Sequence, residues 1–515
     1  MSPLRARGAC AIGCALTLLA AAVQAQTAPT AQPAEKTERE PALSVVPRAG
    51  VTLTATDNNR SSGSGEADLI TRLSAGVQVR KTAGRVQGAL DYTLSGLLYA
   101  RDADESNFQN ELNAFGTAEF VDNWVYLDAS ANVSRQLISA FGSQSSDSSL
   151  DNSNQAEVAT YSLSPYVRGR LGSLADYEAR LSHAATRTDA SGSSDSTING
   201  GSLLLRGGNP LTLFSWSVTG SRTSYDFSEG RRTEEDRVRG VLTLALNSQL
   251  SVSAIGGREA NNFTDLDKQS RSTSGFGISW RPTARTRFTA EGERRFFGTA
   301  HAASFEHRTP RSAIRFSSSR NVGSGLQRLA SRSLGTAFDL FFLQFASVEP
   351  DPVAREQIVN DFLQANGISP TAVIASDFLA SAVTVDRRQE LSYTLLGVRD
   401  TITLLASVTD RRRLDTVAVV DDDFNNSRDI KQRGYDIGWA RRLTPRSTFN
   451  LGLSQSKTTG DLSALATDLR TLRASWSSRL DKKTTVSLGA RHSKFDSESN
   501  PYTENAVVGT LSTTF

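Results

Sequence analysis

The sequence has very little cysteine, and none of it lies beyond residue 14. Its two cysteines are Cys10 and Cys14, so the rest of the chain can form no disulfide, no thiolate metal site and no cysteine nucleophile. The residues before each cysteine also fit poorly with a lipoprotein cleavage site. Small exported domains usually depend on disulfides, so a different constraint must hold this chain together.

Long apolar stretches are also missing. Beyond the N-terminus no segment approaches the ~20 apolar residues of a transmembrane helix, and hydrophobic residues make up only 38% of the chain. That fraction is low for one large globular core, but it suits a barrel in which only alternate strand residues face lipid. If the chain crosses a membrane, we expect it to do so with strands.

Residues that carry chemistry are few. The four histidines, His183, His301, His307 and His492, are scattered and form no HExxH or closely spaced metal motif. We therefore predict no enzyme activity, no metal site and no cofactor. A hydrolase built from strand residues is the remote alternative, because His183 follows Ser182 on a predicted strand.

Acidic and basic residues nearly balance. Removing residues 1–25, which contain two arginines and no acid, lowers the formal net charge from +3 to +1. A near-neutral chain gives no argument for a nucleic-acid partner. The acidic run Asp421–Asp423 offers oxygen ligands for Ca²⁺, but its spacing is not that of an EF-hand loop. We interpret it as a solvated loop.

The N-terminus has the three parts of a secretory signal. Arg5 and Arg7 form the positive region, residues 9–22 the apolar region, and residues 23–25 the small-residue cleavage site. We expect residues 1–25 to be a signal peptide that directs export. Residues 26–42 contain prolines and no periodicity, which predicts a flexible periplasmic leader.

From residue 43 the chain repeats a strand pattern. Segments of roughly 10–14 residues alternate apolar and polar positions and end in turn residues, about 22 times. Short turns, such as 122–123 and 247–248, alternate with longer polar connections, such as 142–155 and 410–427. This parity favours a barrel over a soluble sandwich. The prediction is an all-β transmembrane antiparallel β-barrel of about 22 strands, with 20 as the alternative.

Aromatic residues mark one end of the predicted hairpins. All five tryptophans lie close to a short turn, which predicts a periplasmic aromatic girdle; ordinary core tryptophans are the alternative. These residues are Trp124, Trp216, Trp280, Trp439 and Trp476. The terminal Phe515 resembles the C-terminal strand signal of outer-membrane barrels, although Thr513 departs from it. We therefore expect a Gram-negative outer-membrane location, with outer-membrane lipids and the barrel assembly machinery as partners.

One connection has helical instead of strand periodicity. It covers residues 322–386 and divides predicted strands 1–15, in residues 43–321, from strands 16–22, in residues 387–515. Its apolar positions, expected to plug or cap the barrel, include Phe338, Phe341, Phe342, Phe345, Phe362, Leu363 and Phe378. Exposed apolar surface costs roughly 25 cal/mol per Å², so these helices must pack on something. A lumen of this size holds a plug; a self-packed surface hairpin and a partner-binding module remain open alternatives.

Several arginines are predicted on the lumen face by alternation. They are Arg72, Arg80, Arg180, Arg239, Arg287, Arg295 and Arg491. Rings of arginine favour anionic solutes such as acidic polysaccharides. Acids on the same face, such as Glu178 and Glu291, would pair with some of them, so a balanced wet interior is the alternative explanation.

A further set of residues supports a family resemblance. It comprises the phenylalanine-rich helix ending at Phe345, Pro350-Asp351-Pro352, Phe362-Leu363 before Gly367, Phe378-Leu379, Arg387-Arg388-Gln389, Leu391-Ser392 and Thr401–Leu404. On these residues the chain resembles the outer-membrane β-barrel proteins associated with PEP-CTERM/exosortase systems and exopolysaccharide biosynthesis clusters. The remaining segments match only as a generic barrel. The resemblance implies a role in envelope polysaccharide or sorted-protein export.

Three functional hypotheses follow. The leading one is a channel or assembly factor for exopolysaccharide export, occluded by residues 322–386, with an acidic polysaccharide or an export complex as partner. The rival is a non-conducting structural or anchoring barrel that displays its insert as a surface binding module. A TonB-dependent receptor requires an N-terminal plug domain, and only about 18 residues separate the predicted cleavage site from the first strand, which argues against it.

Overall fold

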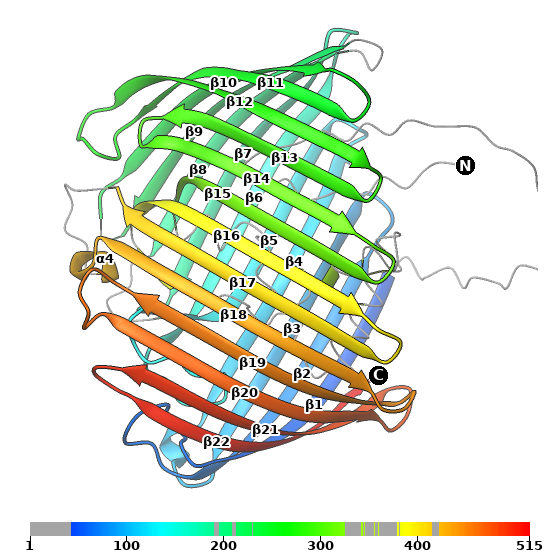
Figure 1. The fold of residues 1–515 in the computed structure, drawn as a ribbon, viewed down its shortest axis with the longest axis vertical. Helices are drawn as coiled ribbons and strands as arrows, with labels where there is room; N and C mark the ends of the chain where they lie inside the picture. Colours follow the sequence, from blue (N-terminus) through cyan, green and yellow to red (C-terminus); the bar gives the residue numbers. More distant parts are fainter. Residues whose placement is uncertain are drawn as a thin grey trace, which may run out of the picture.

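The computed structural model describes residues 43–189, 195–208, 213–228, 230–324, 378–380, 382–414 and 422–515, with Phe341, Phe342, Phe345, Arg355 and Val359. They form one antiparallel sheet of 22 strands that closes on itself, because β1 pairs with both β2 and β22 (Figure 1). The predicted all-β barrel is confirmed, with the larger of the two predicted strand numbers. The predicted signal peptide (1–25) and leader (26–42) lie outside the described residues.

Each strand pairs with its sequence neighbours. The strands are β1 (Leu43–Thr56), β2 (Asp68–Lys81), β3 (Val86–Tyr99), β4 (Asn107–Val121), β5 (Val125–Leu137), β6 (Gln155–Leu171), β7 (Ala175–Thr188), β8 (Ser196–Gly207), β9 (Phe214–Phe227), β10 (Thr233–Ala245), β11 (Leu250–Asn261), β12 (Gln269–Thr283), β13 (Thr286–Arg295), β14 (Gly298–Arg308), β15 (Ser312–Ser324), β16 (Val383–Leu396), β17 (Asp400–Arg413), β18 (Asp429–Arg442), β19 (Ser447–Thr459), β20 (Ala466–Arg479), β21 (Thr484–Ser497) and β22 (Tyr502–Thr514). The described residues also include the 3-10 turn η1 (Ala103–Glu105) and the short helix α4 (Asp423–Asn426).

Short and long connections separate to opposite ends of the barrel. The short turns, such as residues 122–124 between β4 and β5, lie at the end where β1 begins and β22 stops. The longer connections lie at the other end, together with α4 (Figure 1). We call these the short-turn end and the long-loop end. In outer-membrane barrels they face the periplasm and the cell exterior respectively.

The outer wall of the barrel is apolar and the inner wall is polar. Large side chains such as Leu453, Leu488 and Phe276 point outward and are 50%, 57% and 75% exposed. Leaving such a residue in water costs roughly 1.5–3 kcal/mol, so this surface is stable only against lipid. Closure pairs the edge strands and leaves no open sheet edge to the hydrocarbon. The chain is therefore an outer-membrane-type β-barrel.

The structure places all five tryptophans near the short-turn end. Trp124 directly precedes β5, and the others lie near the corresponding ends of β9, β12, β18 and β20. Trp124, Trp280 and Trp476 are at least 39% exposed, and Trp439 donates its indole N–H to Asp400. Among the residues that the structure describes, none of the helices is long and apolar enough to cross a membrane.

The strands extend further into the predicted insert than the sequence indicated. Val322 pairs with Val385 and Ser324 with Val383, so the connection covers residues 325–382 instead of 322–386. The physical reason is that VTVD, residues 383–386, alternates as a strand does. Helical conformation is described at Phe341, Phe342, Arg355 and Val359, with a 3-10 conformation at Phe345. Phe338, Phe362 and Leu363 lie outside the described residues, as does most of the predicted insert.

An arginine substitution should affect stability differently on the two faces of β19. Leu453, midway along the strand, faces lipid, whereas its neighbour Ser454 lies on the inner face opposite Asp436. Leu453→Arg should lower the free energy of unfolding in a bilayer by about 2–4 kcal/mol, because it buries a charge in hydrocarbon. Ser454→Arg is the matched control and should change it little. Urea unfolding in lipid vesicles measures both values; equal losses would contradict the assigned faces.

Candidate functional site

The connection between β5 and β6, residues 138–154, runs across the barrel mouth at the long-loop end. We call it the crossing loop. Its polar contacts reach β2, β3, β4, β20, β21 and β22, and it also touches α4 in the β17–β18 connection. These elements lie around a large part of the wall (Figure 1). The crossing loop therefore spans the mouth instead of extending away from it.

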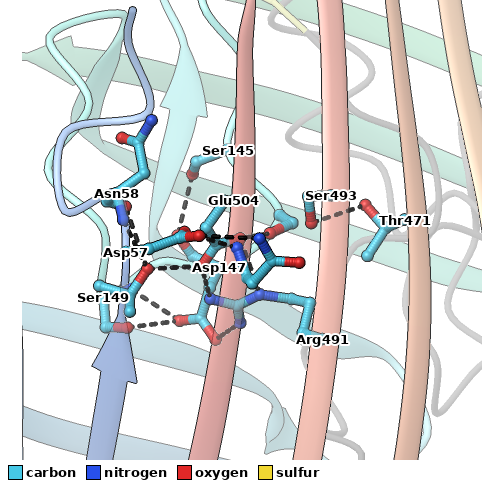
Figure 2. A network of polar contacts seen from close by, with 12 residues as sticks. Asp57, Asn58, Ser145, Asp147, Ser149, Thr471, Arg491, Ser493 and Glu504 are labelled. Atoms are coloured by element: carbon cyan, nitrogen blue, oxygen red, sulfur yellow. Dashed lines mark hydrogen bonds and ion pairs between the residues drawn. The ribbon is translucent and has the colours of Figure 1, made fainter. Parts of the chain in front are cut away.

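An ion-pair cluster fixes the centre of the crossing loop to the inner wall. Asp147 of the loop accepts from Arg491 of β21 at 2.5 Å and lies 4.0 Å from Arg72 of β2. Arg491 also pairs with Glu504 of β22 at 2.5 Å (Figure 2). We call these four residues the latch. It joins three wall strands to one loop through charges.

The latch charges need one another because the wall removes them from water. The side chains of Arg491 and Glu504 are 5% and 0% exposed. Removing one partner of a buried ion pair leaves an uncompensated charge, which is strongly destabilising. Arg473 of β20 lies directly opposite Arg491 in the sheet register and donates to the carbonyl oxygen of Ser146. Asp147 and Glu504 thus balance two facing arginines.

Asp147 stays ionised at this site. Burial by itself would raise the pKa of its carboxyl group. The charges of Arg491 and Arg72, with hydrogen bonds from Ser149, outweigh burial and hold that pKa well below its usual range. The carboxylate is therefore available to both arginines at any pH at which the barrel works.

Neutral hydrogen bonds fix the rest of the crossing loop. The hydroxyl groups of Tyr99 and Tyr502 donate to the carbonyl oxygens of Ser149 and Gln144, at 2.6 and 2.5 Å. Leu150 is fully buried and joins a small apolar cluster with Ile70, Leu97 and Tyr99. Buried backbone groups require partners, and here strand side chains supply them.

The local sequence of the crossing loop explains how it keeps its shape. Asp147 accepts from the backbone N–H and the hydroxyl of Ser149, both at 2.8 Å. Asn154 bonds both the N–H and the carbonyl oxygen of Ser139, at 2.9 and 2.8 Å. Short Ser, Asn and Asp side chains form such bonds with nearby backbone, so this polar segment makes a fixed loop without regular structure.

The acidic β17–β18 connection anchors the crossing loop on the far side. Asp423 of α4 is 9% exposed and accepts from the Ser139 hydroxyl and the Ala140 N–H, both at 2.6 Å. Asp422 caps α4 by accepting from the N–H of Phe424. We interpreted this run as a solvated loop from the sequence, and for Asp422 and Asp423 the structure corrects that interpretation. Burial raises the pKa of Asp423.

The end of the 325–382 connection packs at the same place. Phe378, one of the predicted plug residues, is 3% exposed and lies 5.9 Å from the ring of Phe424. Leu379 donates its N–H to the carbonyl oxygen of Leu137 at 2.9 Å, where the crossing loop begins. The guanidinium of Arg411 stacks on the Phe378 ring at 4.7 Å. The connection and the crossing loop therefore meet at one apolar contact.

The predicted lumen arginines lie on the inner wall, but the structure does not bring all of them together. Arg72 and Arg491 meet at the latch. Arg180 bonds Asp128 and Glu178, Arg239 bonds Glu291 and Glu293, and Arg295 bonds Glu235 and Glu259. Arg80 and Arg287 occupy inner positions of β2 and β13. The wall pairs acids and bases, so no single arginine ring forms from these seven residues.

All four histidines occupy outward-facing strand positions. His183 and His492 are exposed, and each bonds an asparagine side chain, Asn199 and Asn505, at 2.7 Å. Ser182 is on the opposite face of β7 from His183 because strand side chains alternate, so this pair gives no support to a hydrolase. The described part of the chain holds no group of three or more His, Cys, Asp or Glu side chains arranged for a metal ion.

The sequence did not identify Asp147, Glu504 or Arg473 as site residues. Asp147 lies in a segment that we predicted only as a long polar loop, and the strand pattern placed Glu504 and Arg473 among many other charged residues. One signal was present. Leu150 is an isolated large apolar residue in a run of Ser, Asp and Asn, and such a residue has a reason to fold inward.

Breaking the latch should free the crossing loop. We expect Asp147→Asn to speed amide hydrogen exchange in residues 143–152 by about tenfold or more, because a charge-assisted bond worth about 1.5–3 kcal/mol is lost. The matched control is Asp122→Asn at the exposed Arg85–Asp122 pair, which should leave this exchange unchanged. Hydrogen exchange measured by mass spectrometry in detergent micelles reads both. Unchanged exchange in Asp147→Asn would show that the latch does not hold the loop.

Mild acid should not open the latch. Because the pKa of Asp147 is lowered on folding, its stabilising effect is complete above the ordinary carboxyl pKa of about 3.9 and is lost only as the pH falls through the lowered value. Protection of residues 143–152 against hydrogen exchange, corrected for intrinsic rates, should therefore be the same at pH 7 and pH 5. A loss of protection between these values would contradict the assigned charge state.

Among known proteins, the chain is similar only in its general fold, and only to solved structures. No protein-family model matches the chain, and no curated protein matches it. Among solved structures it is similar to the ferric enterobactin receptor PfeA of Pseudomonas aeruginosa, at 9% identity and a TM-score of 0.46, over 91% of this chain and 80% of that one. It is also similar to the FrpB iron transporter of Neisseria meningitidis, at 10% identity and a TM-score of 0.37, over 92% and 82%. These values are too low to support an argument about function.

Proposed function

We propose that the protein is an outer-membrane channel for an acidic exopolysaccharide, and that the crossing loop and the 325–382 connection together occlude it. The observation that carries the proposal is the latch. It holds a loop across the mouth of a wide barrel through side-chain contacts, without a covalent bond. Contacts of this kind can break and reform while the barrel wall stays closed.

The size of the barrel supports transport. A 22-strand barrel encloses a lumen that outer-membrane transporters fill with a plug. In this chain, buried residues of the 325–382 connection include Phe341, Phe345 and Val359. The rings of Phe341 and Phe345 lie 6.5 Å apart, and the guanidinium of Arg355 faces the ring of Phe342 at 4.8 Å. These contacts favour the hypothesis of a packed helical plug or cap and disfavour the alternative of an exposed surface hairpin.

The chemistry of the inner wall supports a polar, anionic polymer. Arginines line the wall in pairs with acids, and Arg473 faces the lumen while remaining exposed. Arginine binds carboxylate groups in a bidentate manner, and a wall of alternating charges gives a hydrated polymer many exchangeable partners. The resemblance of residues 340–404 to barrels associated with exopolysaccharide and PEP-CTERM systems supplies the class of polymer and an export complex as partner.

Uptake of a small ligand is the second candidate. The strand number is the observation that favours it, because barrels of this size include plugged uptake transporters. Unlike polymer export, uptake predicts saturable, high-affinity binding of a small molecule at the long-loop end.

Conductance separates a channel from an anchoring barrel. In planar bilayers the intact protein should show low single-channel conductance, and deletion of residues 334–380 should raise it severalfold because the occluding segment is gone. Asp147→Asn should increase conductance fluctuations. Alginate, an acidic polysaccharide, should block the deleted form more strongly than neutral dextran of equal size. Absence of current in every form, with barrel folding verified by gel mobility, would support the anchoring alternative and contradict the proposal.

A further inference from the structure

The outer wall carries like-charged pairs near the long-loop end. Arg320 of β15 lies directly opposite Arg387 of β16, and Arg433 of β18 lies directly opposite Lys457 of β19. Side chains directly opposite in an antiparallel pair lie about 4.5–5.5 Å apart at Cβ, and like charges there are destabilising. We call these four residues the basic doublets. Two such pairs, one on either side of β17, need an explanation.

Neighbouring cations on the same rim are neutralised by acids. Arg412 pairs with Asp429 at 2.6 Å, and Lys431 pairs with Asp410 at 3.5 Å. The four residues of the basic doublets do not form such ion pairs with any described residue. Two of the four face an acid on the next strand, because Arg387 lies opposite Asp410 and Lys457 lies opposite Asp468. Within the part of the chain that the structure describes, these acids form their ion pairs with other cations, Asp410 with Lys431 and Asp468 with Arg470. Arg320 donates to the carbonyl oxygens of Thr299 and Phe297 instead, at 2.7 and 3.3 Å.

The basic doublets lie just above the lipid-facing band. Each residue shares its strand face with an exposed apolar residue closer to the middle of the barrel. These neighbours are Phe316, Leu391, Tyr435 and Leu453, which are 38–50% exposed. Each lies two or four positions away, which is roughly 7–13 Å along a strand. The positive charges therefore stand where lipid chains end and headgroups begin, on the side that faces the cell exterior.

The spacing of the doublets suits more than one anionic group. They lie on either side of β17, whose outer residue Asp410 is already paired with Lys431. Arg387 and Arg433 are two strands apart, which is about 10 Å between strand axes. A ligand with two phosphate groups could contact both doublets at once. Arginine is well matched to phosphate because its planar group donates two parallel hydrogen bonds.

We propose that the basic doublets bind the phosphorylated headgroup of a glycolipid in the outer leaflet. The headgroup phosphates supply negative charge to cations whose facing acids are paired elsewhere, and the acyl chains continue along the apolar wall below. The binding site depends on membrane insertion alone. It does not require that the barrel conducts, so the conductance experiment and the lipid experiment can fail independently.

The test uses full-length protein and purified bisphosphorylated lipid A in detergent micelles, with binding counted by native mass spectrometry. Each cation near an anionic lipid surface is worth about a fivefold change in affinity. Arg387→Gln combined with Arg433→Gln should therefore weaken binding about 25-fold. The control Arg412→Gln combined with Asp429→Asn removes a neutralised pair from the same rim and should change binding little. Equal weakening by both variants would overturn the proposal.

Two further measurements separate headgroup recognition from other roles. Chemically dephosphorylated lipid A should bind the parent protein as weakly as bisphosphorylated lipid A binds the doublet variant; equal binding of both lipids to the parent would overturn the proposal. Without lipid, removal of repelling charges should leave the thermal midpoint of the doublet variant unchanged or higher. A lower midpoint without lipid would show that the arginines serve the fold itself, which also overturns the proposal.

Discussion

The pairing of β1 with β22 is the constraint on which the rest of the structure depends. Both strands are edges until they meet, and an edge exposes unpaired N–H and C=O groups that hydrocarbon cannot satisfy. Their register, from Arg48–Thr514 to Thr56–Ala506, closes the ring and separates two environments. Every outward residue then meets lipid and every inward residue meets the lumen. The alternation of side chains along each strand therefore decides which residues contact lipid and which contact the lumen.

Closure also decides where charge can be tolerated. On the inner wall, acids and bases pair across strands, as Arg180 does with Asp128 and Glu178. The latch extends this pattern to a loop, since Asp147 adds the second acid to a cluster in which Glu504 alone would otherwise face two arginines, Arg473 and Arg491. On the outer wall, charge gathers near the rims, and the acids that face the basic doublets, Asp410 and Asp468, form their ion pairs with Lys431 and Arg470 instead. The same residue type thus has different consequences on the two faces.

The sequence predicted the periodic features of the fold well because they depend on local chemistry. Alternation, turn composition and connection length predicted an antiparallel barrel of about 22 strands, and the structure has that architecture. The segment 383–386 was placed in the insert although it alternates as a strand. Its pairing with β15 depends on a partner about 60 residues away, which local periodicity cannot reveal.

The crossing loop shows which features the sequence determined by itself and which the tertiary structure decided. By itself the sequence determined that residues near 142–155 form a long polar connection and that Arg72 and Arg491 face inward, because both follow from composition and alternation. Only the tertiary structure decided that the loop turns into the barrel and places Asp147 between those arginines. Arg72 and Arg491 are far apart in the chain and become neighbours only when β22 closes on β1. The site exists because the ring closes, and closure is a long-range event with no local signature.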